Sequence, residues 1–172
     1  MSDDGFATLL FDLLTPEEEL NRANVFDIPL LGRRLAAATD WLRGQRETSQ
    51  LTLGYFGAST GAAAALIAAA DLGHQVSAVV SRGGRPDLAA SRVGEVTAPT
   101  LLIVGGLDDQ VLELNRQAQR QLYCTNDLEV VVGATHLFEE PGTLEAVARL
   151  ASDWFARHVD AAPAPKPAVH KT

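Results

Sequence analysis

Short apolar runs alternate with longer amphipathic stretches along most of this chain. The apolar runs cover residues 6–11, 51–56, 76–81, 100–104 and 128–132. Their nearly continuous apolarity predicts strands that are covered on both faces, as in a parallel sheet. Strands that alternate with helices indicate an α/β fold. We therefore predict a doubly wound, mostly parallel sheet.

The intervening stretches have helical spacing. Leu31, Leu35, Ala38 and Leu42 recur every three to four residues, which marks one helix face. Further helices are predicted over residues 59–70, 111–122 and 143–158. Thr15, Pro16 and Glu18 form the pattern of a capping box at the start of a short helix.

The size and charge of the chain restrict its class. It has 172 residues, 47% of them apolar, and a formal net charge of −8. We expect one domain over residues 1–160 and a disordered Ala/Pro-rich tail over 161–172. The acidic balance argues against nucleic acid and acidic membranes as partners. The sequence leaves the oligomeric state open.

Several features favour a cytoplasmic protein without bound metal. Cys124 is the single cysteine, so the chain can form no internal disulfide. The first residues lack the pattern of a signal peptide, and the longest apolar stretch, 62–70, is too short to span a bilayer. No zinc-ligand spacing occurs. We expect no cofactor.

Gly57, Ser59 and Gly61 form G-x-S-x-G between a predicted strand and a predicted helix. This pattern is typical of a nucleophile elbow, in which a tight turn exposes the serine hydroxyl. The Thr60 N–H, at the start of the helix, is the expected first oxyanion donor. The alternative is structural: the glycines permit a tight turn, and Ser59 caps the helix.

A serine nucleophile needs a histidine base and a carboxylate that orients the base. Asp108 and His136 each follow a predicted buried strand, and the order Ser59, Asp108, His136 is that of α/β hydrolases. Asp109 is closer to the next helix and is expected to be its cap. The alternative for His136 is a loop histidine bonded to backbone.

From about residue 6 to 159 the chain resembles bacterial α/β hydrolases of the dienelactone-hydrolase-like group. The matching segments are 6–15, 57–63, 81–88, 105–111 and 133–138. The resemblance implies that Asp108 and His136 are the acid and base. Dienelactone hydrolase itself has cysteine at the elbow, so Ser59 favours a serine esterase acting on a small carboxylic ester or lactone through an acyl-serine. Some relatives are fused to a phosphoribosyltransferase domain.

The resemblance also implies a truncation at the N-terminal side. The family fold has strands ahead of Phe6, and the loop after the third supplies a second oxyanion donor. That strand would lie between residues 6–11 and 51–56, so a gap in the sheet is expected. Either the start at Met1 is too late, or the first strand moves into the gap, or a partner supplies the strand. Loss of one donor costs roughly 100- to 1000-fold in rate, so weak activity is expected.

Two other functions remain open. A non-catalytic remnant would keep the triad side chains without a working pocket. A Rossmann-type nucleotide-binding module would need G-x-G-x-x-G, but Gly54, Gly57 and Gly61 have different spacing. Arg82 and Arg85 either bind an anionic substrate beside the site or simply cover the loop.

Overall fold

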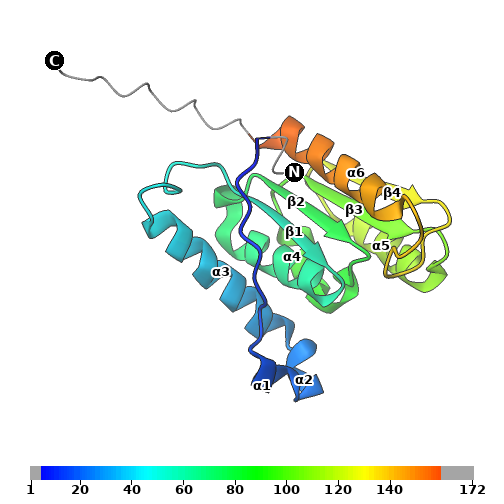
Figure 1. Ribbon diagram of the computed structural model, residues 1–172, viewed down its shortest axis with the longest axis horizontal. Coiled ribbons are helices and arrows are strands. Elements are labelled where there is room, and N and C mark those ends of the chain that lie inside the picture. The colour runs from blue at the N-terminus through cyan, green and yellow to red at the C-terminus, as the bar shows by residue number, and fades with distance from the viewer. Residues whose placement is uncertain (1–4, 160–172) are drawn as a thin grey trace.

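The structure is a computed structural model and describes residues 5–159. Four parallel strands form the centre of this part of the chain. The expected tail, 161–172, lies outside these residues. The strands β1 (Gly54–Ala58), β2 (Ala78–Arg82), β3 (Thr100–Gly105) and β4 (Asn126–Val131) lie side by side in chain order, so β1 and β4 are the edges (Figure 1). The parallel pairing agrees with the continuous apolar runs.

Helices cover both faces of this sheet. One face packs against α3 (Ile28–Gly44), α4 (Thr60–Leu72), α5 (Asp109–Gln121) and the 3-10 segment η3 (Pro86–Glu95), through strand residues such as Val79 and Leu102. The other face packs against α6 (Thr143–His158) through Val80 and Ile103. Neighbouring residues of one strand thus enter opposite cores. The doubly wound α/β fold is confirmed.

The remaining elements are short. They are α1 (Pro16–Glu19), α2 (Arg22–Val25) and η2 (Gly73–Gln75). The predicted capping box is present at α1, because the Glu18 N–H donates to Thr15 Oγ1 and the Thr15 N–H donates to the Glu18 carboxylate. Within residues 5–159, no helix is long and apolar enough to cross a bilayer.

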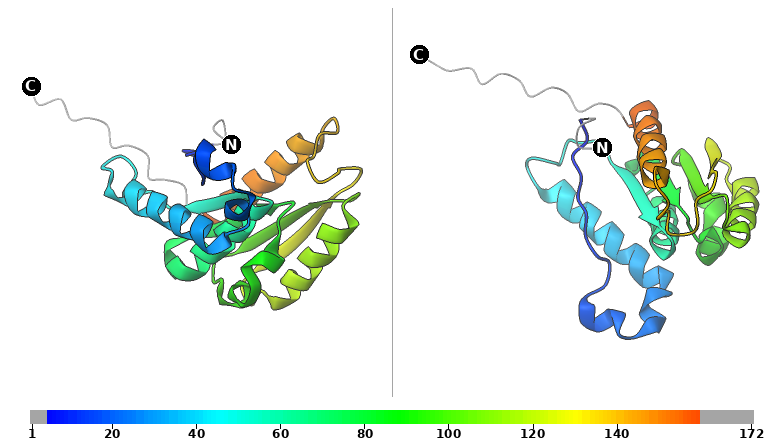
Figure 2. Two further views of the ribbon diagram at one scale, coloured as in Figure 1. Left: turned by 90° about the horizontal axis from the view of Figure 1, so that it is seen from below. Right: turned by 45° about the vertical axis from the view of Figure 1, so that its right-hand side comes forward.

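The predicted strand over residues 6–11 is wrong. This segment has no regular secondary structure, and Leu10 is 92% exposed. It runs beside β1 on the side away from β2 (Figures 1 and 2). A cavity of about 1000 Å³ is lined by residues 6–14 on one side and by β1 on the other. An apolar run forms a strand only where a neighbouring strand offers its hydrogen-bonding groups, and residues 6–11 pair with none of the four strands described.

The cavity occupies the position of the expected gap in the sheet. Its walls are mostly apolar and include Tyr55, Phe56 and Phe155. Residues 6–14 form its far wall, which contradicts the possibility that the first apolar run moves into the gap. Next to the cavity, β1 pairs with β2 alone among the strands of residues 5–159.

Candidate active site

The candidate residues lie at the carboxyl ends of the strands. Ser59 follows β1, Arg82 ends β2, Asp108 follows β3 after a short turn, and His136 follows β4. Because all four strands are parallel, their carboxyl ends lie together at one end of the sheet. Chain segments that are far apart in sequence are thereby collected at a single location.

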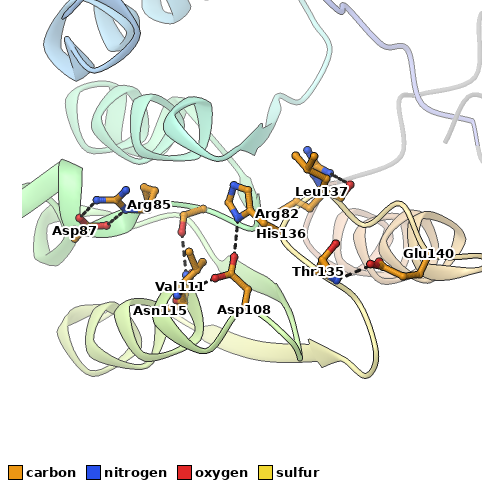
Figure 3. Close-up of polar contacts among 11 residues, drawn as sticks. Arg82, Arg85, Asp87, Asp108, Val111, Asn115, Thr135, His136, Leu137 and Glu140 are labelled. Carbon is orange, nitrogen blue, oxygen red and sulfur yellow. Dashed lines mark hydrogen bonds and ion pairs between the residues drawn. The ribbon is translucent and has the colours of Figure 1, made fainter. Parts of the chain in front are cut away.

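Asp108 and His136 form a direct contact. The Asp108 Oδ2 atom lies 2.7 Å from His136 Nδ1, and Figure 3 shows the other ring nitrogen pointing away from Asp108. The side chains are 17% and 38% exposed, respectively. A carboxylate at Nδ1 fixes the ring orientation and the tautomer, and leaves Nε2 to accept a proton.

Two local features hold Asp108 in this position. It is the N-cap of α5, and its Oδ1 accepts a hydrogen bond from the Val111 N–H at 3.4 Å. The expectation that Asp109 is the cap is therefore wrong: one carboxylate uses one oxygen for the helix and the other for His136. The turn before it needs Gly105, because a Cβ there would lie 2.5 Å from the carbonyl oxygens of Ala134 and Thr135.

Ser59 occupies the strained turn that the elbow pattern predicts. Its φ is +50°, an unusual value for a residue with a side chain. A Cβ at Gly57 would lie 2.5 Å from the Gly61 carbonyl oxygen, whereas a Cβ at Gly61 would meet open space. The turn thus requires only the first of the two glycines sterically. Ser59 is at the N-cap position of α4, but its side chain makes no capping hydrogen bond.

The loop after β2 connects Ser59 with His136. The Ser59 N–H donates to the Arg82 carbonyl oxygen, and the Arg85 N–H donates to the Ser59 carbonyl oxygen, both at 3.2 Å. A Cβ at Gly83 would lie 3.6 Å from His136 Cε1. Within residues 5–159 the Ser59 hydroxyl makes no hydrogen bond to His136. Catalytic hydrogen bonds are often long without substrate and shorten when it binds.

The Thr60 N–H begins α4 and therefore has no partner within the helix. Thr60 and Gly61 also line the apolar cavity beside β1, which extends to the elbow. Within the part of the chain that the structure describes, no three His, Cys, Asp or Glu side chains could hold a metal ion together.

Arg82 and Arg85 have different surroundings. Arg85 makes two hydrogen bonds to the Asp87 carboxylate, at 2.8 and 2.7 Å, which raise its pKa. Arg82 donates to the Leu137 carbonyl oxygen at 3.3 Å and lies over the Phe138 ring, 5.4 Å from its centroid. Partial burial lowers the pKa of the Arg82 guanidinium. The side chain of Arg82 therefore covers the histidine loop, and that of Arg85 is already ion-paired (Figure 3).

The sequence reasoning missed residues that support the histidine loop and α5. Glu140 accepts a hydrogen bond from the Thr135 N–H at 3.1 Å. The Thr135 side chain first, and then the backbone N–H groups of Glu140 and Thr135, lower the pKa of Glu140. Asn115 is fully buried on the apolar face of α5. A polar residue four positions after Val111, at a core position of the helix, is the signal that could have revealed it.

Comparison with known proteins places this geometry in a family. Residues 5–161 match the dienelactone hydrolase family. The structure resembles dienelactone hydrolase from Anabaena variabilis ATCC 29413, with a TM-score of 0.83 and 55% identity, over 87% of this chain and 71% of that one. A dienelactone hydrolase-like promiscuous phosphotriesterase from metagenomic libraries, 19% identical, has a TM-score of 0.67, over 83% of this chain and 67% of that one. This second likeness concerns the fold alone.

A curated relative has a different kind of name. A Mycobacterium tuberculosis H37Rv protein, provisionally named a phosphoribosyl transferase, is 68% identical over 155 residues, or 90% of this chain. The chain spans only 35% of that protein's length. The matched family and the Anabaena structure agree with the parallel sheet and its flanking helices. The chain therefore belongs to the dienelactone hydrolase family.

Proposed function

We propose that this chain is a serine hydrolase that cleaves a small carboxylic ester or lactone. Ser59 Oγ attacks the carbonyl carbon while His136 Nε2 takes the hydroxyl proton, and Asp108 orients the imidazole through Nδ1. The tetrahedral oxyanion accepts a hydrogen bond from the Thr60 N–H. His136 then returns the proton to the leaving oxygen, and an acyl-serine forms. Water, activated by the same histidine, hydrolyses it.

One observation carries this proposal. Asp108 contacts one ring nitrogen of His136 at 2.7 Å and leaves the other available to accept a proton. The imidazole lies beside the loop that holds the backbone of Ser59. The φ of Ser59 is strained, and its hydroxyl makes no capping hydrogen bond to α4. Both observations support the role of nucleophile over that of helix cap. Family membership favours hydrolysis over the dinucleotide-binding alternative.

The other proposed roles follow from the same geometry. Arg82 is the better candidate for contact with substrate, because Asp87 already pairs with Arg85. Phosphoribosyl transfer is the name of a relative of which this chain spans only 35%, and no contact among the described residues favours that activity in this chain. Thr60 is the oxyanion donor that we assign within residues 5–159, and we propose that a site acting with this donor alone would be roughly 100- to 1000-fold slower than a site with two donors.

The test is the presteady-state hydrolysis of 4-nitrophenyl acetate. We expect a burst of product from the wild type, no burst from Ser59→Ala, and an unchanged burst from Ser49→Ala, a control in the loop before β1. A fluorophosphonate should label the wild type but not Ser59→Ala. Equal hydrolysis by wild type and Ser59→Ala would contradict the proposal, and a wild type that is not labelled would favour a non-catalytic remnant.

A further inference from the structure

Asn115 is a fully buried amide close to the candidate site. It lies on α5, whose N-cap is Asp108. Its Nδ2 donates to the carbonyl oxygens of Val111 at 2.8 Å and Gly84 at 2.9 Å. The first bond stays within the helix. The second joins α5 to the loop after β2 (Figure 3).

That loop holds the backbone of Ser59 on both sides. The Arg82 carbonyl oxygen accepts the Ser59 N–H, and the Arg85 N–H donates to the Ser59 carbonyl oxygen. Gly84, the partner of Asn115, lies between these two positions. A shift of the loop at Gly84 would therefore move the anchors of the serine turn.

Through its N-cap residue, α5 also positions His136. Asp108 caps α5 and contacts His136 at 2.7 Å, while Gly83 lies against the imidazole. The bond from Asn115 to Gly84 thus connects the helix that orients His136 with the loop that anchors Ser59. It spans the two halves of the site.

Packing alone does not account for an amide at this position. The buried neighbours of Asn115 on α5 are Val111, Leu112 and Ala118, so a leucine would suit the face. The Oδ1 atom of Asn115 is buried without a hydrogen-bond partner among residues 5–159, which costs free energy that an apolar side chain would avoid. Nearby, the backbone of Gly84 approaches β2 so closely that a Cβ there would lie 2.0 Å from Ser81 Oγ.

We propose that Asn115 is a positioning residue that fixes Ser59 relative to His136. This inference rests on the proposed serine mechanism. Loss of the bond to Gly84 releases the loop, and the distance between the hydroxyl and the imidazole then varies. A misplacement of about 1 Å costs on the order of 100-fold in rate. We therefore expect acylation to slow, with substrate binding little changed.

The experiment compares Asn115→Leu with Asn126→Leu. Asn126 is a matched control because its Nδ2 also donates to two carbonyl oxygens, those of Leu122 and Cys124. It lies at the amino end of β4, and therefore at the end of the sheet opposite to the candidate site. With 4-nitrophenyl acetate, the burst amplitude counts active sites and the burst rate measures acylation per site. We expect Asn115→Leu to lower that rate roughly 10- to 100-fold, with the substrate dissociation constant, taken from the concentration dependence of the burst rate, within about twofold. Asn126→Leu should leave both unchanged.

A second variant addresses poor folding. In Asn115→Ser the hydroxyl can still bond the Val111 carbonyl oxygen, one turn earlier, but is too short for Gly84. We expect the same slow burst. In addition, amide exchange of Arg85, whose N–H bonds Ser59, should accelerate in both Asn115 variants and not in Asn126→Leu. An unchanged burst rate per site and unchanged Arg85 exchange would overturn the inference, whereas full activity of Ser59→Ala would overturn the serine mechanism instead.

Discussion

The sheet is closely packed around β3 and open beside β1. All six residues of β3 are buried, and both of its edges are paired with other strands. In contrast, within the described part of the chain β1 pairs with β2 alone, Phe56 is 44% exposed, and a cavity of about 1000 Å³ adjoins the strand. The two regions belong to one sheet but differ in how firmly their neighbours hold them.

The candidate site spans this boundary. Asp108 and His136 follow β3 and β4, where the tight approach of Gly105 to Ala134 and Thr135 fixes both loops. Ser59 follows β1, and its backbone is held from the β2 side. The comparison suggests that the acid–base pair is set by dense packing, and that the nucleophile depends on fewer contacts.

The largest effect is expected on the dense side, from Asp108→Asn. Asparagine still caps α5, but it cannot accept the Nδ1 proton in the same way, so the imidazole loses its tautomer. We expect kcat to fall about 10,000-fold, measured with 4-nitrophenyl acetate. Asp109→Asn, next to it on the exposed side, is the control and should retain activity. Comparable losses in both variants would indicate a general electrostatic effect.

Substitution in the core tests the packing difference directly. Ile103→Ala removes a fully buried side chain from β3 and should lower the free energy of unfolding by about 2–5 kcal/mol. Leu10→Ala, in the exposed wall of the cavity, should change it by less than about 0.5 kcal/mol. Urea denaturation measures both. A large cost for Leu10→Ala would show that the open side contributes to the core.

Amide exchange tests the free edge of β1. The Ser59 N–H bonds β2, and successive N–H groups of a strand point to opposite sides, so those of Phe56 and Ala58 face the cavity. We expect them to exchange on the order of 100-fold faster than those of Tyr55 and Gly57. Equal protection of the four amides would mean that the outer edge is covered in solution.

The smallest effect concerns the ion pair between Glu18 and Arg34 on the open side. The Arg34 guanidinium, with the Thr15 N–H, lowers the pKa of Glu18 to about 2. Because the pKa of Glu18 is lower in the folded than in the unfolded chain, the ion pair stabilises the fold fully above the unfolded pKa, about 4.3. This stabilisation is lost as the pH falls through about 2. Glu18→Gln should therefore be slightly less stable at pH 6, and the difference should vanish near pH 2. The control, Glu17→Gln, should show no such convergence.

Much of the fold could be predicted from sequence. The helix predicted over residues 143–158 is α6, and the four later apolar runs are the four strands, with shifts of one to three residues at their ends. These predictions succeed because apolar periodicity reports local burial. The glycine and the serine of the elbow could also be predicted from the sequence. So could the location of Asp108 and His136 at the same end of the sheet, since parallel strands bring their carboxyl ends together.

The failures have a tertiary cause. Residues 6–11 have the apolarity of a strand, but a strand exists only through pairing, and its neighbour was not visible in the sequence. The cap of α5 fell on Asp108 rather than Asp109 because a carboxylate has two oxygens, and one can serve the helix while the other binds His136.

By itself, the sequence determined where the four strands and α6 lie, where the strained turn lies and in what order the chemical groups appear, because these depend on local pattern. Only the tertiary structure decided which of the two aspartates caps α5, that Arg82 rather than Arg85 lacks a paired carboxylate among the described residues, and that Asn115 connects α5 to the loop at Gly84. Those outcomes depend on distances between segments far apart in the chain, which no local pattern specifies.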